Sequence, residues 1–237
     1  MSASAESEAE IDVFLSLFSE WYGIPPHWQR LADVKGQAFE DLWTNLWFAK
    51  GQLTAPLDAR LRDKYASAFS YVEPYLSAGT PEPPACLPPL LKKTWTLGVI
   101  ILCDQISRNI FRNSARAYAT DLLARRLIRP FLEEFDTLPV PVRVSLVLVL
   151  LHSEDMADWG LAALADGGVS QDLIDAYVTR TKPQLENNCD FVSQSLRRIS
   201  NNHRDRMRMF EWLQERNKFL GRESSEQEPA YMKGMDG

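Results

Sequence analysis

The chain has 237 residues, 45% hydrophobic and 24% charged, enough apolar material for one large core or two small ones, and its net charge of −6 argues against bulk nucleic-acid binding. No apolar run is as long as a membrane-spanning helix, and the acidic start MSASAESEAE is unlike a secretory signal peptide. The three cysteines are scattered and odd in number, which fits neither a disulfide framework nor paired zinc ligands, so we expect a cytoplasmic protein without membrane contact.

Helical patterns fill the first third of the chain. Residues 1–8 are expected to form a disordered lead, and apolar positions from 11 to 21 then follow a helical spacing. The same spacing recurs at 37–48 and at 56–76. The stretch GTPEPPACLPP at 79–89 holds five prolines and cannot be regular helix, so it predicts an extended connector packed across the surface.

The rest of the chain also predicts helices. They are expected at 90–107, at 115–135 with a bend near Pro130, at 142–165, at 170–182, from Pro183 onward, and at 203–219. The apolar run 144–151 would also suit a buried strand, but no other segment has the alternating pattern of a partner strand. We therefore predict a single all-α domain of about nine or ten helices over 9–224, followed by a partly disordered tail at 225–237.

A first polar cluster lies in the stretch 97–121, which begins as apolar as a buried helix and then becomes densely polar. Its candidate ligand-binding residues are Asp104, Gln105, Arg108, Asn109, Arg112 and Arg116. Asp104 and the three arginines are spaced by four, so in one continuous helix they would form a stripe with excess positive charge. Because the arginine fork suits carboxylate or phosphate, this favours an anion site, with internal pairing as the alternative. We expect Arg108 to pair with Asp104, and Arg112 to be free for an anion.

A second polar cluster, His152-Ser153-Glu154-Asp155, follows the wholly apolar run. His152 and Asp155 are candidate catalytic residues, because their spacing of three places them on one helix face, where a carboxylate could orient an imidazole for acid–base work. Glu154 is a candidate ligand-binding residue. The spacing is not that of a zinc helix, so no metal and no cofactor are expected. The alternative is that His152 and Asp155 form a buried, hydrogen-bonded pair that interacts with the arginines of the first cluster.

A third polar cluster lies near the end of the chain. It contains the candidate catalytic His203 and the candidate ligand-binding residues Arg204, Asn217, Arg222 and Glu223. The chain has no glycine-rich phosphate loop, no nucleophile elbow and no cysteine–histidine nucleophile pattern. We expect the three clusters to meet, with Arg108 or Arg112 close to Glu154 or Asp155, or sharing a pocket with His203 and Arg222.

At these clusters the sequence resembles a bacterial family called domain of unknown function 924. The matching motifs are DQISRN at 104–109, HSED at 152–155, HR at 203–204, RN at 216–217 and LGRES at 220–224. The resemblance implies an all-helical, tetratricopeptide-like array and no established activity. The chain departs from the family pattern at Glu215, where the family has histidine, and at Cys103, where it has an aliphatic residue.

Two functions from different classes fit these observations. The first is a helical binding protein whose polar pocket holds an anionic small molecule or a peptide carboxylate. The alternative is a hydrolase or transferase for a small phosphorylated or carboxylated substrate, with His152 or His203 as general acid or base. A purely structural polar core, whose charges neutralise one another, is the third interpretation. The oligomeric state is left open.

Overall fold

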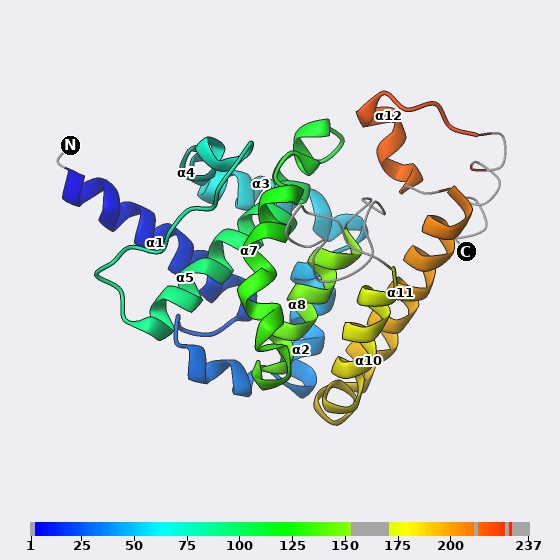
Figure 1. Cartoon of the computed structure of the whole chain (residues 1–237), viewed down its shortest axis with the longest axis horizontal. Helices are drawn as coiled ribbons and strands as arrows, with labels where there is room; N and C mark the ends of the chain where they lie inside the picture. Colours follow the sequence, from blue (N-terminus) through cyan, green and yellow to red (C-terminus); the bar gives the residue numbers. More distant parts are fainter. Residues whose placement is uncertain (1–2, 153–170, 211–212, 226–227, 229–237) are drawn as a thin grey trace.

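A computed structural model describes residues 3–152, 171–210, 213–225 and 228, and every regular element in these residues is a helix (Figure 1). The prediction of an all-α array of about nine or ten helices in one compact domain is confirmed. None of the described helices is both long enough and apolar enough to cross a bilayer.

The first helix, α1 (Ala3–Tyr22), packs lengthwise against α5 (Pro89–Ile101). The two backbones approach most closely at Gly98, because a Cβ atom there would overlap the carbonyl oxygen of Phe14. The prediction of a disordered lead is wrong for residues 3–8, which are helical. Their alanine and glutamate residues are strong helix formers, and acidic side chains near a helix N-terminus stabilise it.

An aromatic cluster joins α1 to the next segment. Helix α2 (Gly36–Leu42) continues into a π-helical turn at Trp43–Trp47, where the Trp47 ring stacks on Trp21 at 5.1 Å between centroids. The Trp47 indole also donates a hydrogen bond to the Trp21 carbonyl at 2.9 Å. Burial of the two rings fixes α2 against α1.

The two short segments that follow complete this half. Helix α3 (Thr54–Tyr65) is followed by the single-turn helix α4 (Phe69–Val72). The predicted connector is irregular over residues 76–88, although Pro89 already belongs to α5. It begins beside Tyr75, whose carbonyl accepts a hydrogen bond from Arg126 at 2.6 Å.

The central helical run extends beyond the expected 90–107. Helix α5 passes into a π-helical turn at Leu102–Ile106 and then into α6 (Ser107–Ile110). It ends at Phe111, and Asn113 adopts a left-handed conformation with φ of 65°. The predicted stripe of one aspartate and three arginines therefore reaches only from Asp104 to Arg108. Arg112 and Arg116 lie beyond the end of α6.

Two further helices cover the central run. Helix α7 (Asp121–Glu133) contains Pro130 as expected, and α8 (Val140–Leu151) is buried along almost its whole length. The preference for helix over strand at 144–151 is confirmed. The described part of this segment ends at His152, so its expected continuation to 165 lies outside the described residues.

The C-terminal part forms a helical hairpin beside α8, seen at the right of Figure 1. Helix α10 (Gln171–Asn188) runs through Pro183, and α11 (Asp190–Phe210) follows after one residue. The predicted start at Pro183 is wrong, because packing of α10 on α8 and α11 outweighs the backbone hydrogen bond that proline removes. The predicted helix at 203–219 is wrong as one continuous helix: residues 203–210 belong to α11, but Leu213 has an extended backbone.

A short helix, α12 (Asn217–Leu220), follows and ends at Gly221, whose φ is 68°. Positive φ is readily adopted by glycine, and the amide of Arg222 then bonds back to the Asn217 carbonyl at 3.0 Å. We call residues 213–225 together with Glu228 the C-terminal segment. Its helix α12 lies at the upper right of Figure 1.

Candidate functional site

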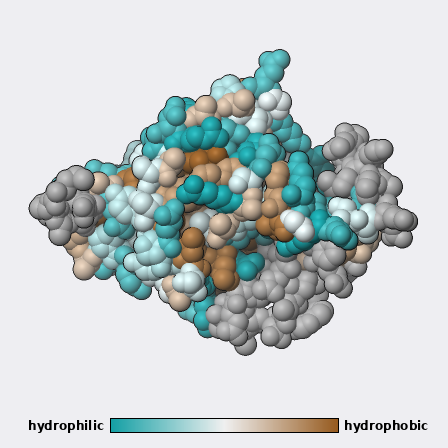
Figure 2. All heavy atoms as spheres, turned by 90° about the horizontal axis from the view of Figure 1, so that it is seen from above, coloured by the Kyte–Doolittle hydropathy of each residue, from teal (hydrophilic) through white to brown (hydrophobic). Residues whose placement is uncertain are grey.

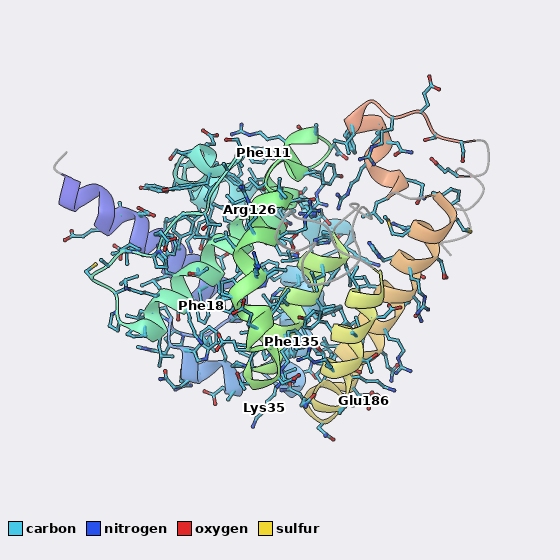
Figure 3. The ribbon with its side chains drawn as sticks, viewed as in Figure 1. Phe18, Lys35, Phe111, Arg126, Phe135 and Glu186 are labelled. Carbon is cyan, nitrogen blue, oxygen red and sulfur yellow. The ribbon has the colours of Figure 1, made fainter. Side chains whose placement is uncertain are left out.

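A cavity of about 650 Å³ lies between the turn after α6, the end of α8 and the C-terminal segment. The first polar cluster contributes Arg108 and Arg112 to its lining and the second contributes His152, whereas the motifs RN and LGRES contribute Arg216 and Ser224. The lining residues are Arg108, Arg112, Asn113, Ala117, Tyr118, His152, Leu213, Gln214, Arg216, Lys218, Phe219, Ser224 and Glu228. Phe111, labelled in Figure 3, marks the end of α6 at the top of the bundle, beside this turn. Seen from above, this side of the molecule is mainly hydrophilic, with apolar patches near its middle (Figure 2).

A buried carboxylate and an imidazole form a pair at the cavity. Asp104 is 1% exposed, and His152 Nδ1 lies 2.9 Å and 3.0 Å from its two carboxylate oxygens. The wide π-helical turn presents Asp104 to the end of α8, where His152 follows the last apolar turn. Gln105 donates a further hydrogen bond to Asp104. Nδ1 is therefore anchored, and no described residue bonds to Nε2, the ring nitrogen available to the cavity.

Charge and burial together set the protonation of this pair. Burial alone would raise the pKa of Asp104, but the positive charges of His152 and Arg108 outweigh it, so its pKa falls to about 2. Burial, reinforced by the Arg108 charge, lowers the pKa of His152 below its ordinary value despite the carboxylate. We conclude that Asp104 is ionised at neutral pH and His152 is neutral, with the Nδ1 proton donated to the carboxylate.

The lowered pKa of His152 predicts a pH dependence of stability. Because the unfolded chain binds the proton more tightly, the free energy of unfolding should be largest above about pH 6.5, the ordinary histidine value, and fall as the pH drops towards the folded pKa. Urea unfolding between pH 7.5 and 5 should show this loss, and His152→Gln should reduce it. An NMR titration that gives the folded His152 a pKa above 6.5 would contradict the prediction.

Two arginines converge on one carboxylate beside the pair. Arg108 donates to Asp121 at 2.9 Å and lies 3.4 Å from the Asp104 carboxylate, so its expected pairing with Asp104 is present. Arg216 donates to the same Asp121 oxygen at 3.1 Å and to the His152 carbonyl at 2.9 Å. The Arg216 guanidinium also lies over the Tyr118 ring, 4.5 Å from its centroid. These contacts attach the C-terminal segment to α7 and α8.

The expectation of a free Arg112 is wrong. Arg112 forms a two-point contact with Asp58 of α3, at 2.5 Å and 2.9 Å, and Asn109 donates to the same carboxylate at 2.9 Å. The contact uses Nε and one terminal nitrogen of Arg112. The side chain is still 43% exposed and lines the cavity, so the other terminal nitrogen can reach a ligand.

Several predicted site residues lie elsewhere. Arg116 is exposed and pairs with Glu73 at 3.2 Å, and Arg204 pairs with Asp175 at 3.5 Å beside a second cavity. Neither arginine belongs to the lining of the main cavity, and the same holds for His203, Asn217, Arg222 and Glu223. His203 is buried on α11, whereas Glu223 is exposed. Glu154 and Asp155 lie outside the described residues, so their expected contact with the arginines stays a prediction.

Five charged residues of the site, Asp58, Asp121, Arg216, Lys218 and Glu228, were not among the candidate residues predicted from the sequence, although Arg216 lies in the RN motif. Asp58 is an acid beside the apolar positions of α3, which was the one available signal. Lys218 resembled any exposed lysine of a basic stretch. Glu228 lies in the tail that was expected to be partly disordered, yet it is 2% exposed and accepts a hydrogen bond from Asn217 at 2.8 Å. The tertiary structure brings Lys218 and Glu228 to the cavity wall and Asp58 to Arg112, which lines the cavity.

The described residues hold no cluster of side chains that could bind a metal ion. In residues 3–152, 171–210 and the described C-terminal positions, no three His, Cys, Asp or Glu side chains lie close enough to share a metal ion. The Asp104–His152 pair therefore has no third such ligand among them.

Comparison with known proteins gives one match. Residues 32–236 match the model of a family described as bacterial protein of unknown function (DUF924). This range contains the cavity and all of its lining residues. Neither the curated proteins nor the solved structures contain a significant match to the chain.

Proposed function

Because the chain belongs to the family of bacterial proteins of unknown function (DUF924), which carries no assigned activity, we propose from the geometry that it binds a small anionic molecule or a peptide carboxylate. The binding site is the cavity between α6, α8 and the C-terminal segment. The observation that carries the proposal is the convergence of Arg108, Arg112, Arg216 and Lys218 on this cavity.

The placement of the acids supports the proposal. The carboxylates of Asp58, Asp104 and Asp121, which pair with the arginines, are absent from the described cavity lining. They hold the guanidinium groups in place, while the described part of the cavity lining carries four cations and one acid. Fixed guanidinium groups bind carboxylate or phosphate with little further loss of side-chain freedom.

The proposal is tested by thermal-shift and calorimetric titrations with inorganic phosphate, glycerol 3-phosphate, succinate and citrate at low salt. At least one anion should raise the melting temperature, and added salt should weaken its binding. Lys218→Met should weaken the binding of the anion several-fold. Lys35→Met, which removes an exposed lysine outside the cavity lining, should leave the binding unchanged. If no anion binds, or if both variants behave alike, the cavity is not an anion site.

The Asp104–His152 pair favours a second candidate function, acid–base catalysis on the bound anion. A neutral imidazole held by a buried carboxylate through Nδ1 can accept a proton at Nε2 from a water molecule or a hydroxyl group. We propose a hydrolase or transferase reaction for this case, tested with p-nitrophenyl phosphate and p-nitrophenyl acetate. Turnover that His152→Gln abolishes, with anion binding retained, would support catalysis. Turnover that survives in this variant would reject it.

We also propose a reducing compartment, the cytoplasm, for the protein. Cys103 and Cys189 are buried as free thiols in the helical array, and Cys86 is an exposed free thiol. Cys103 lies one residue before Asp104, so its oxidation would disturb the packing under the site.

A further inference from the structure

A separate cavity of about 260 Å³ lies between the proline-rich connector 76–88, α5 and α7. We call it the connector cavity. It shares no lining residue with the main cavity, and all of its lining residues belong to the described range 3–152. We propose that the connector cavity is a second binding site, which takes a small monocarboxylate with an apolar body. This site does not depend on the function proposed for the main cavity.

The first observation is the apolar part of the lining. It consists of Pro81, Pro83, Leu127, Pro130 and Phe131. The Phe131 ring stacks on a tryptophan, Trp28, with 6.3 Å between the ring centroids, so the ring is held in place. Prolines restrict their own backbone, so this wall is formed before a ligand binds and little ordering is needed. The wall therefore suits the carbon skeleton of a small ligand.

The second observation is the charge of the lining. Five charged side chains line the connector cavity, and two of them neutralise each other, because Lys93 donates to both carboxylate oxygens of Glu134 at 2.6 Å and 2.7 Å. The other three are Lys92, Arg126 and Glu82. Two cations and one acid leave a single net positive charge.

The third observation is that neither of these two cations is neutralised by a described acid. Arg126, labelled in Figure 3, donates to the carbonyl oxygens of Tyr75 and Leu76 at 2.6 Å and 3.3 Å, and these neutral acceptors do not cancel its charge. Lys92 is half-buried, and its ammonium group has no hydrogen bond or ion pair with the part of the chain that the structure describes. Glu82 is exposed, so water and salt screen its charge.

These observations together define the class of ligand. One carboxylate balances the single net charge and accepts a charge-assisted hydrogen bond from Lys92. A dianion such as a phosphate monoester would bring a second negative charge close to the two acids of the lining, which disfavours it. The volume lies just below the range of drug-sized sites, so the ligand has the size of one aromatic ring with short substituents.

The test uses three probes in calorimetric titrations at low salt. Benzoate carries both features, benzamide keeps the ring without the charge, and acetate keeps the carboxylate without the ring. The wild-type protein should bind benzoate about tenfold more tightly than either of the others, since each lacks one of the two contributions. In NMR spectra, the benzoate ring protons should show nuclear Overhauser effects to the Leu127 methyl groups.

The matched variants are Lys92→Met and Lys50→Met. Methionine keeps the apolar stem and removes an ammonium group without a described partner, so Lys92→Met should fold and lose the preference for benzoate over benzamide. Lys50 is exposed and lies outside the lining of both cavities, so Lys50→Met should keep the preference. Melting and circular dichroism without ligand check the fold of both variants.

The outcomes separate this site from the main cavity. Benzoate that binds no better than benzamide, or a preference that survives in Lys92→Met, would overturn the inference. The same holds if the Overhauser effects to Leu127 are absent, a measurement that needs no variant. If Lys218→Met weakens benzoate binding and Lys92→Met does not, benzoate occupies the main cavity and the inference is wrong. Failure of the four anions of the first screen would reject the proposed function and leave this site standing.

Discussion

Replacing Asp104 with alanine is expected to lower the free energy of unfolding by about 3–5 kcal/mol, among the largest effects of any single change in this protein. The carboxylate is buried and accepts hydrogen bonds from His152 and Gln105. Its loss leaves a buried imidazole without its partner and removes one of the two acids that face Arg108. Urea denaturation at pH 7.5 measures the change.

Two controls give this prediction its specificity. Asp104→Asn keeps the shape and one acceptor oxygen, so it should lose less stability, about 1–3 kcal/mol. Asp63→Ala removes an exposed acid of α3 and should stay within about 0.5 kcal/mol of the wild type. If Asp104→Ala is as stable as Asp63→Ala, the Asp104–His152 pair does not stabilise the contact between the π-helical turn Leu102–Ile106 and the end of α8.

Replacing Arg216 with methionine should weaken the packing of the C-terminal segment on α7 and α8 by about 3–5 kcal/mol of free energy. The arginine is 4% exposed and bonds Asp121 and the His152 carbonyl, so its loss leaves the buried Asp121 with Arg108 alone. The effect should appear as faster hydrogen exchange and easier proteolysis at 213–225. Anion binding should weaken strongly, because Arg216 and Lys218 both belong to this wall.

The matched control is Arg116→Met, which removes an exposed arginine whose pair with Glu73 is solvated on both sides. Surface pairs of this kind contribute about 0–1 kcal/mol, so the variant should melt close to the wild type. Unchanged exchange at 213–225 in Arg216→Met would mean that other contacts hold the C-terminal segment. The assignment of Arg216 as its main attachment would then be wrong.

The helical architecture was predictable because it depends on local pattern. The apolar periodicity of α1 and α5 and the apolar residues that dominate α8 each predicted a buried helix, and the structure has them. Helix boundaries were predicted less well where the local sequence signal and the tertiary packing disagree. At Pro183 the missing amide argues for a helix start, but packing on both sides keeps α10 continuous.

The candidate site could be predicted as a set of polar residues but not as a network. Asp104, Arg108 and His152 stood out because polar side chains follow apolar helical runs, where burial requires partners. The choice of partners depends on contacts across long separations. Arg112 and Asp58 are 54 residues apart, and no local rule pairs them. Arg112, which was expected to be free, is therefore paired with Asp58. Its two-point contact leaves one terminal nitrogen for a ligand.

By itself, then, the sequence determined that this chain forms helices and delivers three polar clusters to helix ends, since periodicity and burial are properties of neighbouring residues. Tertiary structure alone decided that Asp104 faces His152, that Asp121 joins Arg108 to Arg216, and that the tail brings Glu228 into the cavity. These contacts follow from how the helices pack and from where the chain turns after α6. Hydrogen bonds and ion pairs act over about 3 Å, so small differences in helix placement decide which groups meet.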